Sequence, residues 1–91
     1  EKLLREITKE FRRITIMNPS FYEGYVYRLL AHKALREFDE ALNLAEYMKN
    51  LFPERPDGYV FKYTIYKDMN ELEKAEQEKR EALNIDPSFV F

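Results

Sequence analysis

The chain has 91 residues, a formal net charge of −2, 45% apolar residues, 35% charged residues and no cysteine. This composition fits one small folded domain, and the lack of cysteine excludes disulfides, thiolate metal sites and cysteine nucleophiles. No apolar run approaches the roughly 18 residues of a spanning helix, so we expect no membrane insertion. The same lack of cysteine makes a reducing, cytoplasmic location the default expectation.

Helical periodicity predicts five helices and almost no strand. The first, over residues 1–17, carries one apolar stripe opposite lysines and arginines. The stripe consists of Leu4, Ile7, Phe11 and Ile14. Ser20 with Glu23 three residues later has the pattern of a capping box, which predicts a second helix over about 21–35.

The third helix is predicted at about 37–51, where a proline then stops it. Another proline, suited to a first helical turn, opens the fourth at 56–68. Asn70 with Glu73 repeats the cap pattern and predicts the fifth at 71–84. The apolar face of the third consists of Phe38, Ala41, Leu42, Ala45 and Met48. The fifth is mostly charged, with a narrow buried stripe of Leu72, Ala75, Ala82 and Leu83.

Residues recur at a fixed offset of 34. Pro19, Pro53 and Pro87 keep this step, as do Gly24 and Gly58. Isolated glycines inside helices indicate close helix approach rather than a phosphate loop. A period of this length is typical of stacked antiparallel helical hairpins. We therefore divide the single domain into the second half of a repeat (1–20), two full repeats (22–55 and 56–89) and the start of a further unit (90–91).

The pattern resembles the tetratricopeptide repeat, which has aromatic, Leu-Gly, Tyr, Ala and closing Pro positions. The second full unit matches through Tyr59, Tyr66, Leu72, Ala75, Ala82, Leu83, Ile85, Asp86 and Pro87. The first matches through Tyr25, Phe38, Ala41, Leu51 and Pro53, and an earlier half unit through Phe11 and Pro19. The Leu-Gly pair is replaced by Arg28-Leu29 and Lys62-Tyr63, and His32 stands where tyrosine is expected. The resemblance implies an all-α fold, a five-helix α-solenoid.

By the same resemblance, the first helix of each unit lines a concave groove that binds a peptide. The implied peptide-binding residues are Glu23, Val26, Tyr27, Leu30 and Lys33 in one unit, and Asp57, Val60, Phe61, Thr64 and Lys67 in the next. The family also has a mode that clamps a terminal carboxylate with lysine, asparagine and arginine. The asparagines are missing here, so we do not expect that ligand.

A search for reactive chemistry finds little. His32 is the only histidine, and a lone imidazole on an apolar helix is more often a packed or surface residue than a ligand or base. The many carboxylates of the fifth helix alternate with lysine and arginine, as on a solvated helix face. We therefore predict no catalytic residues, no metal site and no cofactor, and we do not expect an enzyme.

Three functional hypotheses remain. The first is a protein-interaction scaffold that binds a partner peptide or domain in the groove. The second is self-association into a ring, filament or swapped oligomer, in which a basic N-terminal helix meets an acidic C-terminal one. The third, nucleic-acid binding, is disfavoured by the negative net charge.

Overall fold

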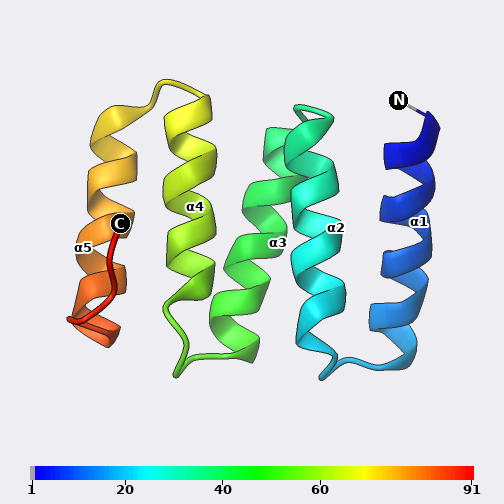
Figure 1. Cartoon of the computed structure of the whole chain (residues 1–91), viewed down its shortest axis with the longest axis horizontal. Coiled ribbons are helices and arrows are strands. Elements are labelled where there is room, and N and C mark those ends of the chain that lie inside the picture. The colour runs from blue at the N-terminus through cyan, green and yellow to red at the C-terminus, as the bar shows by residue number, and fades with distance from the viewer. Residues whose placement is uncertain (1) are drawn as a thin grey trace. The chain divides into compact units, whose positions relative to one another are not determined.

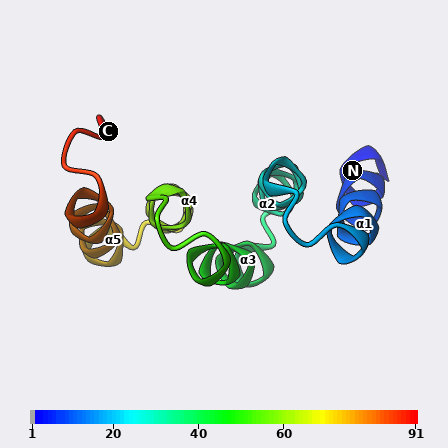
Figure 2. The same ribbon diagram turned by 90° about the horizontal axis from the view of Figure 1, so that it is seen from below.

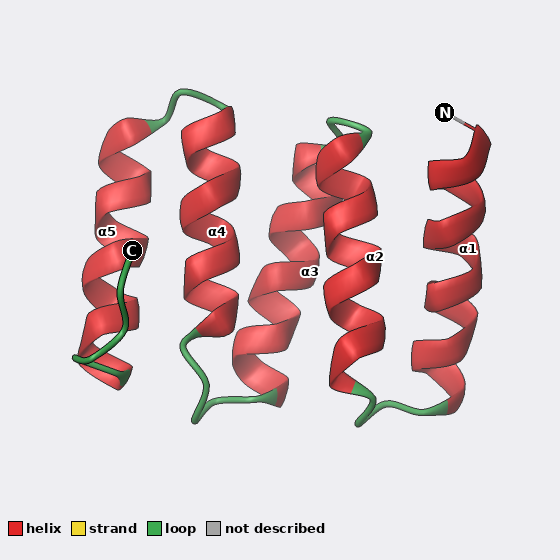
Figure 3. Cartoon of the chain, viewed as in Figure 1, coloured by secondary structure: helices red, strands yellow, loops and turns green. Residues whose placement is uncertain are grey.

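A computed structural model describes residues 2–91, and over this part of the chain it contains α-helices joined by short loops and no strand (Figure 1, Figure 3). Every predicted helix boundary lies within one residue of the observed one, because turn signals punctuate the periodic segments so regularly. The observed helices are α1 (Lys2–Met17), α2 (Tyr22–Ala34), α3 (Phe38–Leu51), α4 (Asp57–Asp68) and α5 (Leu72–Ile85). The expectation of an all-α chain of five helices is thereby confirmed.

The 34-residue period is present in the backbone itself. Helices α1, α3 and α5 end at Met17, Leu51 and Ile85, each two residues before a proline. Each proline takes the second position of a four-residue turn, where its fixed φ is favourable. The residue two after the proline donates its backbone N–H to the carbonyl of the residue before it: Phe21 to Asn18, Arg55 to Phe52 and Phe89 to Asp86.

The turns after α2 and α4 also repeat. Arg36 and Asn70, 34 residues apart, have positive φ values of 59° and 61°. After α2, the N–H of Arg36 donates to the carbonyl of Lys33, and the N–H of Glu37 donates to the carbonyl of His32. The same two bonds follow α4. This pair of bonds around one left-handed residue is the Schellman motif, which satisfies carbonyls at the end of a helix.

The predicted capping boxes are wrong. Asn70 closes α4 instead of opening α5, whose N-cap is Glu71, without a side-chain cap hydrogen bond. The N-cap of α2 is Phe21 rather than Ser20, and it too lacks a side-chain cap bond. The proline expected in the first turn of α4 is its N-cap, one residue earlier. In each case the backbone turn positions the helix start without a side chain.

The chain forms two compact units that divide within α3, between Leu44 and Ala45. In unit 1, up to Leu44, α1 and α2 pack side by side in opposite directions (Figure 1, Figure 2). The Tyr25 hydroxyl donates to the Pro19 carbonyl at 2.8 Å, which ties α2 to the turn before it. The apolar core of this unit consists of Tyr25, Leu29, Ala31, Ala41 and Leu44.

The close approach of α1 and α2 depends on Gly24. A Cβ atom at this position would lie 2.8 Å from the Thr15 Cγ2 methyl and 3.0 Å from the Phe21 ring. Thr15 is buried, and its hydroxyl donates to carbonyls of its own helix, to Phe11 at 2.8 Å and to Arg12 at 3.0 Å. The predicted role of this glycine in helix approach is confirmed.

In unit 2, from Ala45 onward, α4 and α5 pack side by side in opposite directions (Figure 1). A Cβ at Gly58 would lie 2.9 Å from the Ala45 carbonyl oxygen, so α4 also approaches the C-terminal part of α3 closely. Leu72 is 55% exposed, contrary to its predicted place in the buried stripe. The buried apolar residues are Ala45, Met48, Ile65, Ala75 and Ala82.

The C-terminal residues 89–91 are not helical and fold back onto unit 2 (Figure 1). The Phe91 ring meets the Tyr63 ring edge-on, with the centroids 5.0 Å apart. Phe89 makes a similar contact with Phe91 at 5.0 Å. Val90 remains 89% exposed.

Candidate interaction surface

The first five predicted binding residues share the outward face of α2 in unit 1. The buried residues of this helix are Gly24, Tyr25, Leu29 and Ala31, so the predicted residues are not part of the core, although the Tyr27 ring contacts Phe11 of α1. Tyr27 is 53% exposed and Leu30 is 43% exposed. Glu23 is also exposed, whereas Val26 and Lys33 are half-buried. Two large apolar side chains are thus presented to solvent one turn apart.

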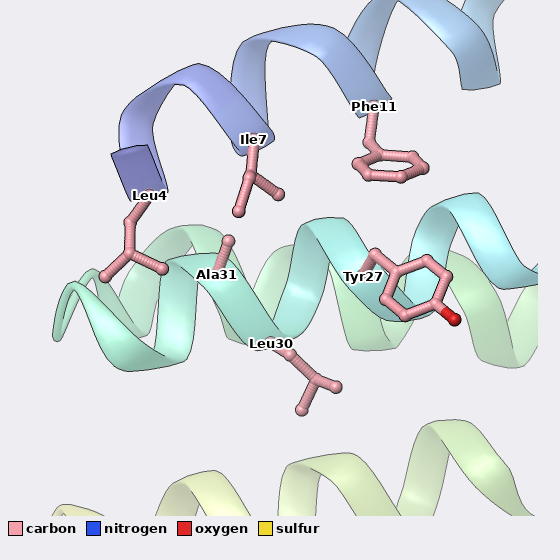
Figure 4. Close-up of a pocket in the computed structure, with 6 residues that line it drawn as sticks. All are labelled: Leu4, Ile7, Phe11, Tyr27, Leu30 and Ala31. Atoms are coloured by element: carbon pink, nitrogen blue, oxygen red, sulfur yellow. The ribbon is translucent and has the colours of Figure 1, made fainter. Parts of the chain in front are cut away.

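An apolar depression of about 390 Å³ opens between α1 and α2 (Figure 4). The rings of Phe11 and Tyr27 close one end, with centroids 5.3 Å apart and planes inclined by 38°. Figure 4 shows the α1 side chains pointing toward α2 across this space. The lining residues are Leu4, Ile7, Phe11, Tyr27, Leu30 and Ala31.

The structure changes the composition of the predicted site. Tyr27 and Leu30 come together with three α1 residues that were predicted only as that helix's apolar stripe. The sequence held a usable signal, since a stripe at steps of three and four must face a partner helix, but it did not show that part of the stripe stays accessible. Apart from the Tyr27 hydroxyl the lining side chains are apolar, so the depression suits apolar side chains.

The other five predicted residues lie on α4 in unit 2, and several make contacts within their own unit. Asp57 pairs with Arg55 at 3.3 Å. The Thr64 hydroxyl donates to the Phe61 carbonyl at 2.9 Å. Val60 and Phe61 are half-buried, and the exposed Lys67 has its Nζ 5.5 Å from the centre of the Tyr63 ring. This face therefore offers less exposed apolar surface than the matching face of α2.

A network of charges in unit 2 was not predicted. Lys62 of α4 pairs with Glu46 of α3 at 2.9 Å and lies 3.5 Å from Glu78 of α5. Lys49 is 3.7 Å from Glu78, and its Nζ lies 4.1 Å from the centre of the Tyr59 ring. The Lys62 and Glu78 side chains are only 13% and 12% exposed. Lys62 stands where the tetratricopeptide pattern has leucine. A lysine at this usually apolar position was the sequence signal that could have indicated the network.

These contacts shift the acid–base properties of the network. The hydrogen bond from Lys62 is the main cause that lowers the pKa of the Glu46 carboxylate, and Lys49 adds to it. Burial of Lys62 works to lower the pKa of its ammonium, but the hydrogen bond to Glu46 and the charge of Glu78 outweigh burial and raise it. The charged forms of Glu46 and Lys62 are therefore both favoured, as expected for paired charges in a structural network.

His32 belongs to a second group of polar contacts, at the end of α2. Its Nδ1 lies 2.9 Å from Glu37 Oε1, and the Arg5 guanidinium donates to Glu37 Oε2 at 2.8 Å. The hydrogen bonds from His32 and then from Arg5 lower the pKa of the Glu37 carboxylate. The imidazole is half-buried and paired, in agreement with the expectation of a packed residue. Across residues 2–91, no group of three or more histidines or carboxylates could hold a metal ion.

Comparison with known proteins identifies no family for this chain. No protein-family model matches the chain, and no curated protein matches it. What the structure supports is a helical-repeat arrangement of five α-helices within residues 2–91. None of these helices has the length and apolar character needed to cross a membrane.

Proposed function

We propose that this chain is a protein-interaction module that binds a partner peptide or domain through the outward face of α2. The observation that carries the proposal is the apolar depression of unit 1, with Tyr27 and Leu30 exposed at its edge. Burial of a large apolar side chain is worth about 1.5–3 kcal/mol, so two or three anchors offset much of the cost of association. A concave apolar site with few polar groups suits recognition rather than catalysis.

The finer arrangement belongs to the same proposal. The recurrence of helix ends and turns every 34 residues supports stacking of the tetratricopeptide type, in which α2 and α4 would line one groove. The α4 face, with Val60, Phe61 and Lys67, would then extend the binding surface. We further propose that the chain is not an enzyme, needs no cofactor, does not bind nucleic acid and acts in the cytoplasm.

Self-association is the second candidate. It is favoured by the large exposed apolar side chains at Leu3 and Val90 and by an uneven distribution of charge. The first 44 residues carry eight basic and seven acidic side chains, whereas residues 45–91 carry seven basic and ten acidic ones. Light scattering over a range of salt concentrations tests this candidate. A mass of one chain at both low and high salt would remove it.

The binding proposal is tested by selecting peptides from a random display library against the purified chain. The selected peptides are then measured against Leu30→Ala and against Leu72→Ala, which removes a similarly exposed leucine from α5. We expect Leu30→Ala to weaken binding about three- to tenfold and Leu72→Ala to leave it unchanged. Peptides that bind equally to both variants and to the original chain would place the contact elsewhere.

A further inference from the structure

One end of the apolar depression is formed by an aromatic ring of α2, and an exposed carboxylate stands one helical turn before it in the sequence. Tyr27 rests against Phe11 yet remains 53% exposed, so part of its ring is open to a ligand. Glu23 lies four residues earlier on the same face of α2 and is exposed. Side chains on a helix lean toward its N-terminus, which brings the Tyr27 ring over the turn that holds Glu23. Figure 4 shows the Tyr27 hydroxyl pointing away from Leu30, as this lean requires.

Over residues 2–91 the Glu23 carboxylate takes part in no ion pair, whereas Glu10, next to Phe11 on α1, is paired with Arg13. An apolar depression with an unpaired carboxylate one helical turn beyond its Tyr27 end is complementary to a segment that carries apolar anchors and a positive charge.

The 34-residue repeat independently supports a positively charged group of the partner at Glu23. Thirty-four residues after Glu23 stands Asp57, which pairs with Arg55 at 3.3 Å. The residue that corresponds to Arg55 in unit 1 is Phe21, which has no charge. Unit 2 therefore supplies a cation for its acidic residue, Asp57, whereas unit 1 supplies none for Glu23.

We propose that the segment bound in the depression presents an arginine that stacks on Tyr27 and pairs with Glu23, beside its apolar anchors. This inference rests on the proposed function and names the chemistry of the partner. Arginine suits the position because its planar guanidinium can lie on an aromatic ring while its edge donates to a carboxylate. The depression spans two turns of α1, from Leu4 to Phe11, so the occupant is an amphipathic helix with anchors at matching steps of three and four.

The test uses synthetic amphipathic helices with one leucine stripe and a single variable residue next to it. The variable residue is arginine, citrulline or glutamate, placed at either end of the stripe in separate peptides. Citrulline keeps the shape of arginine and removes its charge. Binding is measured by fluorescence anisotropy to the original chain, to Glu23→Gln and to Glu40→Gln, which removes an exposed carboxylate of α3.

For the original chain we expect the arginine peptide, in one of its two orientations, to bind about three- to tenfold more tightly than the citrulline peptide. This preference disappears in Glu23→Gln and persists in Glu40→Gln. Glutamate in place of arginine weakens binding further. High salt reduces the preference, because an exposed ion pair is screened.

The outcomes separate the inference from the proposal beneath it. Equal binding of arginine and citrulline peptides, with binding still weakened by Leu30→Ala, overturns the arginine site and leaves the apolar site standing. A preference for arginine that survives Glu23→Gln also overturns it. Failure of every peptide to bind overturns both.

Discussion

Replacing Gly58 by alanine tests the close approach of α4 to α3 in unit 2. The added Cβ would lie 2.5 Å from Lys49 Cγ, 2.9 Å from the Ala45 carbonyl oxygen and 3.1 Å from the Lys49 backbone nitrogen. Two of these neighbours are backbone atoms, so α4 must move away from α3. Overpacking of this kind costs about 1–3 kcal/mol, and the better helix propensity of alanine returns at most about 1 kcal/mol. We expect a net loss of about 1–2 kcal/mol in the free energy of unfolding.

Gly24→Ala is the matched control. Its Cβ would meet side-chain atoms, Thr15 Cγ2 at 2.8 Å and the Phe21 ring at 3.0 Å. Thr15→Ser removes that methyl and keeps the hydroxyl, so it should restore part of the stability that Gly24→Ala loses, while no such rescue exists for the backbone contacts of Gly58. Urea unfolding followed by helical circular dichroism measures both. A Gly58→Ala chain at least as stable as the original would refute the contact.

Two further predictions concern the turn after α2. The positive φ of Arg36 is sterically unfavourable for a residue with a Cβ atom but not for glycine. Arg36→Gly should therefore raise the free energy of unfolding by about 0.5–1 kcal/mol. Asn70→Gly should gain less in the same urea assay, because asparagine tolerates this conformation; an equal or larger gain at Asn70 would contradict the argument. The pKa of Glu37 is lowered in the folded chain, so its stabilising effect is present above the unfolded pKa and is lost as the pH falls through the folded one. Unfolding measured between about pH 6 and pH 3 should therefore show a smaller acid loss for Glu37→Gln than for the original chain, and identical pH profiles would argue against the pairing.

Local signals in the sequence were sufficient for the helices. Apolar residues at steps of three and four determine where a helix can bury a face, and Pro19, Pro53 and Pro87 determine where it cannot continue. The capping boxes failed because side-chain patterns compete with the backbone for the same donors. Asn70 fits an N-cap by residue type, but it also tolerates a positive φ, and the end of α4 requires that conformation.

The contacts of the candidate site required the tertiary structure. Arg5 and Glu37 are 32 residues apart and meet only because α1 and α2 are antiparallel neighbours. The depression likewise depends on how far the Phe11 and Tyr27 rings overlap across two helices, which depends on the spacing that Gly24 permits. The sequence by itself determined the repeat and the helices, because these follow from local periodicity. Only the tertiary structure decided which apolar residues remain accessible and which charges are paired, because exposure and pairing depend on residues far apart in the chain.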